Sequence, residues 1–285
     1  WLRNSWQQHY GALATDAIMA LAMQPPTLDI TPADPQADWA TKLEGRLING
    51  HTIRRAFDGD PADLPGFKEG AWWVQDAAAA FPVTLFGDLA GKTVIDLCAA
   101  PGGKTAQLIA AGAQVTAVDS ASKRLKTLRG NLSRLGMKAQ CVTADGRSFA
   151  PAEKVDAVLI DAPCSATGTL RRRPDILRGR KPDEIAALAK LQTALLRQAA
   201  GWLKPDGCLI YATCSLQHEE GEDVAEAIAA DPGSGLTPFP VSTEEAGAFA
   251  AAVTATGTVR LRPDLFADIG GVDGFFVARF RASDG

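Results

Sequence analysis

The feature that most constrains the fold is a short apolar segment that runs directly into a glycine-containing loop. Residues 93–97 are mostly apolar and β-branched, residues 98–103 are mostly small, and helix formers follow from Lys104. This order predicts a strand, a tight loop and a helix. Because Gly102 and Gly103 lack side chains, the backbone can approach a ligand closely, and the first helical turn offers unpaired N–H groups. We therefore expect a binding site at this loop.

Four later segments repeat the pattern of an apolar strand that ends at a polar residue. Helical patterns between the strands favour a doubly wound, parallel sheet, which places the protein in the α/β class with a Rossmann-like core. In such sheets, ligands bind beyond the carboxyl ends of the strands. The residues at or just after these ends should therefore face one crevice, and they are Asp119, Asp145, Asp161, Cys164 and Cys214.

The 285 residues, 46% of them hydrophobic, can bury one large core with a smaller appendage. We expect the Rossmann-like domain to span residues 86–285. Residues 1–85 should form an amphipathic helix, ended by Pro25 and Pro26, and a small α/β subdomain. The segment from Gly274 to Phe280 predicts a last, antiparallel strand near the edge of the sheet.

Cysteine and histidine usage limits the class of protein. Five cysteines, an odd number without Cys-x-x-Cys spacing, indicate reduced thiols in the cytoplasm, and three scattered histidines predict no metal site. No apolar run approaches the roughly 20 residues that span a membrane. We expect Cys98, Cys141 and Cys208 to serve in packing. Since the chain begins with Trp1 rather than Met, we expect it to be a fragment or a processed form.

The net charge of −4 argues against a surface coated with basic residues for nucleic acid. One local segment has the opposite character, because residues 171–181 carry six basic residues and one acid directly after Cys164. Positive charge at the mouth of a pocket is what a phosphate backbone requires. The candidate RNA-binding residues are Arg171, Arg172, Arg173, Arg178, Arg180 and Lys181.

The acidic strand ends indicate which ligand the loop binds. Asp119, about 20 residues beyond the glycines, is placed to accept hydrogen bonds from ribose hydroxyls. The loop lacks the Gly-x-Gly-x-x-Gly pattern of dinucleotide sites, and Cys98 replaces the first glycine of a phosphate-binding loop. A nucleoside without phosphates, such as S-adenosyl-L-methionine, fits better. Asp119 would then contact the ribose and Asp145 the adenine.

Two strand-end cysteines beside a methyl donor indicate a particular chemistry. Thiolate addition to carbon 6 of cytosine makes carbon 5 nucleophilic enough to accept a methyl group. Asp161 could donate a proton to ring nitrogen 3, and Lys104 could place positive charge beside it. The residues alone leave open which of Cys164 and Cys214 is the nucleophile.

At these segments the chain resembles the Nop/Sun family of RNA cytosine-5 methyltransferases. The matching segments are residues 96–105, 161–165 and 211–215 with Glu219 and Glu220, and further matches are 64–67, 74–76, 166–168, 171–172 and 273–276. The resemblance implies an S-adenosyl-L-methionine-dependent enzyme acting on small-subunit (16S) ribosomal RNA, with a small subdomain like an RNA-recognition motif. It implies that Cys214 is the nucleophile and that Cys164 assists product release. The implied cofactor contacts are Cys98, Ala99, Ala100, Pro101, Gly102, Gly103, Lys104, Asp119, Asp145 and Asp161.

Three other interpretations were weighed. The same chemistry could act on transfer RNA, or the chain could be a non-catalytic RNA-binding factor of ribosome assembly, although both strand-end cysteines argue against the second. A DNA cytosine methyltransferase is disfavoured, because the sequence lacks the paired Pro-Cys-Gln and Glu-Asn-Val motifs. We expect a monomer.

Overall fold

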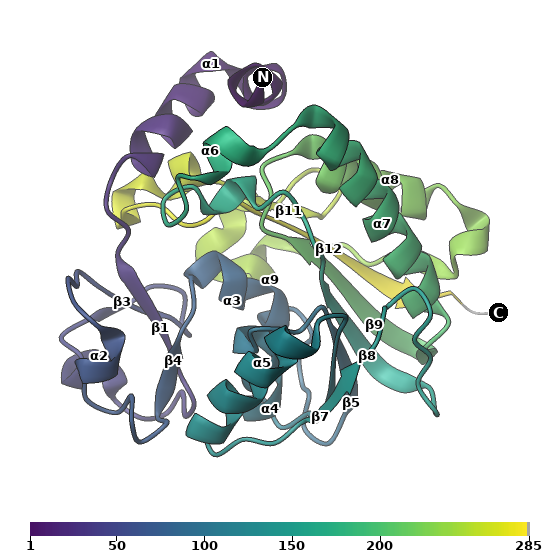
Figure 1. Ribbon diagram of the computed structural model, residues 1–285. Coiled ribbons are helices and arrows are strands. Elements are labelled where there is room, and N and C mark those ends of the chain that lie inside the picture. Colours follow the sequence, from purple (N-terminus) through teal and green to yellow (C-terminus); the bar gives the residue numbers. More distant parts are fainter. Residues whose placement is uncertain (284–285) are drawn as a thin grey trace.

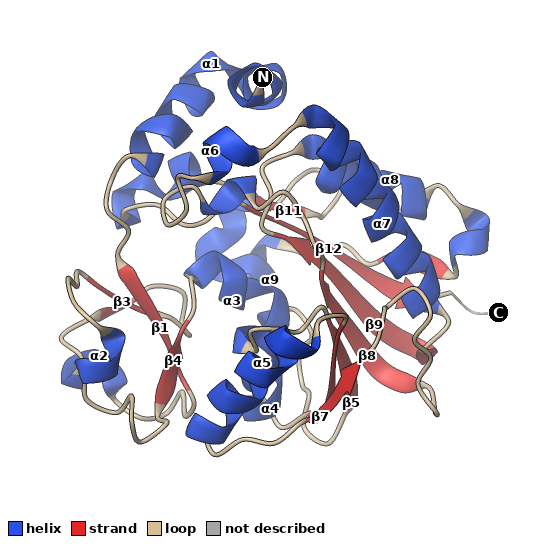
Figure 2. Ribbon diagram, viewed as in Figure 1, coloured by secondary structure: helices blue, strands red, loops and turns tan. Residues whose placement is uncertain are grey.

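A computed structural model describes residues 1–283, and a large, mainly parallel sheet forms its centre (Figures 1 and 2). The strand order is β10-β12-β9-β8-β5-β6-β7, with β11 paired to β12. Strands β5 to β9 are parallel, and β12 runs antiparallel to β9. The expected α/β class is confirmed. The strands are β5 Thr93–Leu97, β6 Gln114–Asp119, β7 Gln140–Thr143, β8 Val155–Asp161, β9 Leu203–Thr213, β10 Leu236–Pro238, β11 Val259–Leu261 and β12 Phe275–Ala282.

Helices cover both faces of this sheet. Val94 and Ile95, neighbours in β5, enter two different buried clusters, as the alternation of side chains along a strand requires. Helices α3 and α4 pack in the first cluster, whereas α7 and α8 pack in the second. The helices are α3 Ala77–Thr84, α4 Gly103–Ala110, α5 Ser122–Arg134, α6 Ile176–Gly179, α7 Pro182–Ala200, α8 Glu222–Ala229 and α9 Thr243–Ala246.

The connection between β7 and β8 departs from the expected alternation of strand and helix. Residues 144–154 form a loop there. Eleven residues that include Gly146 and Pro151 are too few for a helix with two turns connecting it to parallel strands. The chain order still reverses between β5 and β8, and this switch point is where doubly wound sheets bind ligands.

A second, four-stranded antiparallel sheet precedes the large one. Its order is β2-β3-β1-β4, and Ile30, Leu43, Ile53 and Trp72 form its buried core. The likeness of this small sheet to an RNA-recognition motif stays an expectation. Its elements are β1 Leu28–Pro32, α2 Trp39–Lys42, β2 Arg46–Leu47, β3 Ile53–Arg55 and β4 Trp72–Val74.

The N-terminal helix α1, Leu2–Ala22, lies against the large domain (Figure 1). It is kinked at Gly11, whose φ of +80° is non-helical. Trp6 donates to the Gln217 side chain at 2.6 Å and Tyr10 to the Leu216 carbonyl at 2.8 Å. Helix α1 therefore packs on the segment that follows Cys214. The expected domain limit between residues 85 and 86 stays a prediction.

Within residues 1–283, no helix combines the length and apolar content that crossing a membrane requires. Over the same residues, no group of three or more His, Cys, Asp or Glu side chains is arranged to hold a metal ion.

Candidate active site

The loop between β5 and α4 is built from small residues in unusual backbone conformations. Cys98 has a φ of +62°, and Gly102, the N-cap of α4, has a φ of +104°. A Cβ atom at Gly102 would lie 2.9 Å from Cγ of Leu128, so only glycine fits. Burial raises the pKa of Cys98 to about 12, which keeps it a neutral thiol. The loop thus presents backbone rather than charged side chains, as a nucleoside without phosphates requires.

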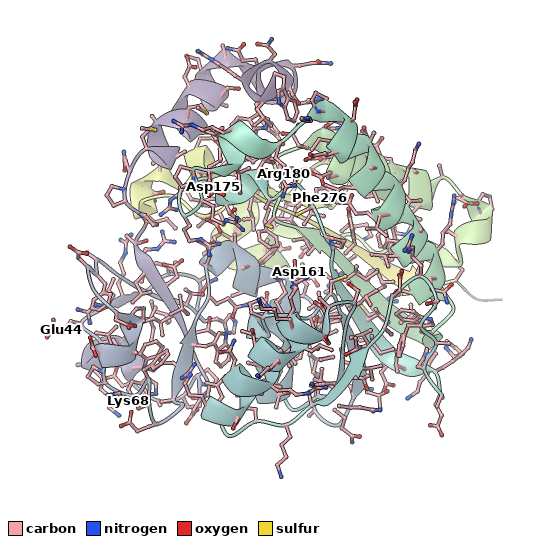
Figure 3. All side chains as sticks on the ribbon, viewed as in Figure 1. Glu44, Lys68, Asp161, Asp175, Arg180 and Phe276 are labelled. Carbon is pink, nitrogen blue, oxygen red and sulfur yellow. The ribbon has the colours of Figure 1, made fainter. Side chains whose placement is uncertain are left out.

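Lys104 connects this loop to the end of β8. Its Nζ lies 2.8 Å from Oδ2 of Asp161 and 4.9 Å from the centroid of the Phe275 ring, and its side chain is buried. Asp161 is partly exposed at the end of β8 (Figure 3). Lys104 therefore holds one oxygen of Asp161 and leaves the other free for a ligand.

Behind this pair, Asp96 accepts a hydrogen bond of 2.5 Å from Thr105. Burial, together with the nearby charge of Asp161, raises the pKa of Asp96 to about 7. A partly protonated Asp96 adds less negative charge beside Asp161. Lys104 is therefore the main charge that balances Asp161.

Asp119 and Asp145 lie at neighbouring strand ends but in different surroundings. Asp119 is buried, accepts from the N–H groups of Ala100 and Ala121 at 3.2 and 3.0 Å, and pairs with Arg124 at 3.4 Å. Binding a ribose there requires the half-exposed Arg124 or another neighbour to move. Asp145 is half-exposed, and hydrogen bonds from the side chain and the backbone N–H of Arg147 lower its pKa to about 2.

The side chains of the two strand-end cysteines, Cys164 and Cys214, are in contact. Sγ of Cys164 lies 3.4 Å from Sγ of Cys214, and neither forms a disulfide, whose sulfurs would be about 2.05 Å apart. The hydrogen bond with Cys214 and burial raise the pKa of Cys164 well above its ordinary value. Cys164 therefore remains a thiol that can donate its proton toward the sulfur of Cys214.

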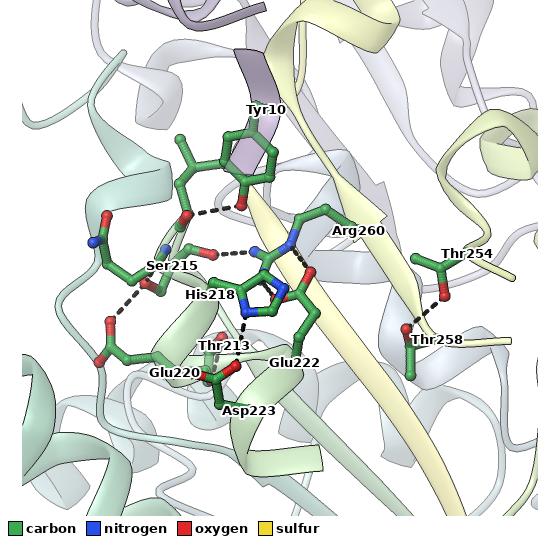
Figure 4. A network of polar contacts seen from close by, with 12 residues as sticks. Tyr10, Thr213, Ser215, His218, Glu220, Glu222, Asp223, Thr254, Thr258 and Arg260 are labelled. Atoms are coloured by element: carbon green, nitrogen blue, oxygen red, sulfur yellow. Dashed lines mark hydrogen bonds and ion pairs between the residues drawn. The ribbon is translucent and has the colours of Figure 1, made fainter. Parts of the chain in front are cut away.

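A buried carboxylate holds the two cysteine loops together. Oε1 of Glu220 accepts from the Ser165 N–H at 2.8 Å, and Oε2 accepts from the hydroxyls of Ser165 and Ser215. Figure 4 shows Glu220 beside Ser215. Gln192 donates to the same carboxylate at 3.2 Å and to the Pro163 carbonyl at 2.9 Å. Because Ser165 follows Cys164 and Ser215 follows Cys214, Glu220 fixes the separation of the sulfurs.

The residue patterns of the sequence assigned no role to Glu220. Glu220 was named only as part of a segment that matches the Nop/Sun family. The signal that the sequence offered for a role of Glu220 was its position six residues after Cys214, where the structure has a 3-10 turn. Its contact with Ser165, 55 residues earlier, could not be deduced from the sequence.

The basic segment after Cys164 divides between internal contacts and solvent. Arg171 is buried, Arg172 pairs with Asp273, and Arg180 donates to the Ser165 carbonyl at 2.9 Å. The exposed side chains that remain for a phosphate backbone are Arg173, Arg178 and Lys181.

Comparison with known families adds an independent observation. Residues 84–281 match the model of a family described as 16S rRNA methyltransferase RsmB/F. The chain belongs to this family. The match covers the whole Rossmann-like part, including the glycine loop and both cysteine loops.

Individual relatives of the RsmB/F family agree with this assignment. A ribosomal RNA small subunit methyltransferase B from Citrobacter koseri is 38% identical over 252 residues, which are 83% of this chain and 59% of that protein. The protein of that name from Vibrio cholerae is 48% identical over 166 residues, 56% of this chain and 38% of the relative. The chain thus spans about half the length of the curated relatives.

Solved structures confirm the fold. A methyltransferase homologue from Pyrococcus horikoshii has a TM-score of 0.79 at 25% identity and covers 98% of this chain and 94% of its own. NSun6 from the same organism, crystallised with SFG, has a TM-score of 0.83 at 18% identity, covers 100% of this chain and 98% of its own, and supports the fold alone. The expectation of S-adenosyl-L-methionine as cofactor is confirmed at the level of the RsmB/F family.

For this RsmB/F family member, we predict that Gly102→Ala weakens S-adenosyl-L-methionine binding by about tenfold or more. The positive φ alone costs an alanine about 1–3 kcal/mol, and the approach to Leu128 shifts the loop further. Isothermal titration calorimetry measures the loss. Gly136→Ala is the matched control, because Gly136 has a φ of +65° with open space around its Cβ position. Equal affinity in both variants would contradict a cofactor role for the loop.

We also predict that Glu220→Gln lowers the free energy of unfolding by about 1–3 kcal/mol, because an amide cannot satisfy all donors around it. Loosening of the two cysteine loops should slow methyl transfer as well. Thermal unfolding and transfer of labelled methyl groups measure both effects. Glu219→Gln is the control, because Oε2 of Glu219 has no hydrogen-bond partner among residues 1–283, so this change should affect neither quantity by as much.

Proposed function

We propose that the chain is an S-adenosyl-L-methionine-dependent methyltransferase that forms 5-methylcytosine in small-subunit (16S) ribosomal RNA through a covalent bond between Cys214 and the base. The observation that carries the proposal is the pair of free thiols 3.4 Å apart at adjacent strand ends. The Lys104–Asp161 pair, between the first turn of α4 and the end of β8, supplies a carboxyl group and a positive charge.

The reaction proceeds by addition, methyl transfer and elimination. The Cys214 thiolate adds to carbon 6 of cytosine, while Asp161 supplies or shares a proton at ring nitrogen 3. Carbon 5 then takes the methyl group that S-adenosyl-L-methionine provides. Loss of the proton at carbon 5 to water or a basic group expels the Cys214 sulfur with its electron pair. On elimination ring nitrogen 3 returns its proton to Asp161, and the products are 5-methylcytosine, S-adenosyl-L-homocysteine and the free thiolate of Cys214.

The geometry supports different roles for the two cysteines. Cys164 keeps its proton, because its pKa is raised by the hydrogen bond with Cys214 and by burial. A thiol that donates to Cys214 stabilises the thiolate form of Cys214 before addition and after elimination. In this proposal Cys214 is the nucleophile and Cys164 assists its departure, as the resemblance to the Nop/Sun family implies. A cytoplasmic setting, where thiols stay reduced, suits this chemistry.

The choice of ribosomal RNA over transfer RNA rests on the family description and on the relatives' names. The cofactor contacts expected from the sequence, Cys98 to Lys104 with Asp119, Asp145 and Asp161, are part of the same proposal. RNA contact by Arg173, Arg178 and Lys181, the exposed side chains of the basic segment, is also part of this proposal.

The test is methyl transfer from labelled S-adenosyl-L-methionine to ribosomal and transfer RNA, followed by mapping of 5-methylcytosine in each. We expect label in the small-subunit RNA and at carbon 5 of cytosine. Label found only in transfer RNA would favour that substrate instead. RNA binding without any transfer would favour an assembly factor.

A further inference from the structure

A cavity of about 200 Å³ lies where the small sheet meets the large domain. Phe57, Leu28 and Val74 give it an apolar wall from the small sheet and its loops, and Val74 is 46% exposed. Asp76, at the start of α3, and Arg172, from the basic segment, line the same space. The cavity thus combines an aromatic ring with groups of opposite charge.

Two polar atoms in this cavity are available to a ligand. Oδ1 of Asp76 accepts from the N–H groups of Ala78 and Asp273 at 2.9 and 3.2 Å. Arg172 uses Nε and one terminal nitrogen on Asp273. Among residues 1–283, no group hydrogen-bonds to Oδ2 of Asp76 or to Nη1 of Arg172. One acceptor and one donor therefore remain beside the Phe57 ring.

A continuous set of contacts joins this cavity to the reacting sulfurs. Asp273, held by both Asp76 and Arg172, precedes Gly274, whose N–H donates to the Gly168 carbonyl at 2.8 Å. The Gly168 N–H in turn donates to the Cys214 carbonyl at 3.0 Å. A nucleotide in the cavity would therefore be a close neighbour of a cytosine at Cys214.

We propose that this cavity binds the base of a nucleotide next to the target cytosine in single-stranded RNA, with Phe57 stacking on the base and Asp76 and Arg172 reading its edge. RNA recognition of this kind places unstacked bases on aromatic rings and reads their edges by hydrogen bonds. Asp76 lines the cavity and disfavours a phosphate there, whereas a base edge offers both donors and acceptors. Because the bound base is the neighbour of the target cytosine, this inference rests on the proposed function.

The contact of Arg55 with the Phe57 ring supports this assignment. The guanidinium lies 5.4 Å from the ring centroid and donates to the Leu43 carbonyl at 2.6 Å. Positive charge near a stacking ring attracts an RNA chain to this edge of the small sheet.

The test uses the full chain and short single-stranded RNAs that carry the mapped target cytosine with each possible base on either side. RNA dissociation constants are measured by fluorescence anisotropy, and KM and kcat by methyl transfer. Phe57→Ala should weaken RNA binding by about tenfold and raise KM more than it lowers kcat, whereas Phe57→Trp should retain binding. Affinity for S-adenosyl-L-methionine should not change in either variant.

Asp76→Asn tests the reading of the base edge. The two N–H groups on Oδ1 fix the orientation of the new amide, so Oδ2 becomes an NH₂ donor and the acceptor is lost. The preferred neighbouring base should therefore change by about fivefold or more. An unchanged preference, or an equal loss for all neighbouring bases, would overturn the proposal.

Leu47→Ala is the matched control, because Leu47 is 54% exposed on the outer strand β2 and does not line the cavity. Equal RNA affinity for Phe57→Ala and Leu47→Ala would also overturn the proposal. If the unaltered protein binds RNA but transfers no methyl group, the proposed function fails. The anisotropy comparison then still decides whether the cavity binds a base.

Discussion

Cys214→Ala is expected to abolish methyl transfer, with a loss of at least about 10⁴-fold, and to abolish the covalent complex with RNA that carries 5-fluorocytosine. Fluorine at carbon 5 blocks the proton loss that frees the enzyme, so the unaltered protein should remain bound through Cys214. Denaturing electrophoresis with labelled RNA measures the complex. The reason is chemical, because Cys164, the second thiol of the pair, keeps its proton: the hydrogen bond with Cys214 and burial raise its pKa well above the ordinary value.

Cys208→Ala is the matched control for this experiment. Cys208 is a free cysteine in the middle of β9, the strand that Cys214 directly follows, and burial raises its pKa to about 11. Its replacement should leave the complex intact. A covalent complex that persists in Cys214→Ala would contradict the nucleophile assignment. The assays require a reductant, because oxidation could join two sulfurs that lie 3.4 Å apart.

The elements that sequence patterns predicted are those set by local chemistry. Residues 93–97 form β5, and the helix formers from Lys104 lie in α4, because these local patterns depend on near neighbours. The prediction that Cys164 and Cys214 lie close together needed one further rule. Parallel strands have their carboxyl ends at the same edge of a sheet.

The features that sequence patterns could not predict depend on contacts between distant segments. The Trp6–Gln217 hydrogen bond joins residues 211 positions apart, and the Glu220–Ser165 bond joins residues 55 apart. The surroundings of the aspartates at the strand ends could not be predicted from the sequence either. Asp119 and Asp145 both lie at strand ends, yet one is buried beside Arg124 and the other is half-exposed beside Arg147. No local pattern distinguishes these outcomes.

Cys164→Ala is expected to have the opposite effect to Cys214→Ala, namely accumulation of covalent protein–RNA complex on ordinary RNA. The variant can still add Cys214 to carbon 6 and transfer the methyl group. It lacks the S–H group 3.4 Å away that stabilises the departing sulfur, so elimination slows. We expect at least about ten times more complex than with the unaltered protein, measured by denaturing electrophoresis during turnover.

Two comparisons make this prediction specific to the thiol. Cys164→Ser restores a hydroxyl donor at the same place, so the complex should accumulate less than in Cys164→Ala. The double variant Cys164→Ala, Cys214→Ala should form none, because accumulation requires prior addition by Cys214. Rapid turnover of Cys164→Ala without accumulation would refute the role in release. A complex in the double variant would instead show that another residue adds to the base, and both cysteine assignments would then fail together.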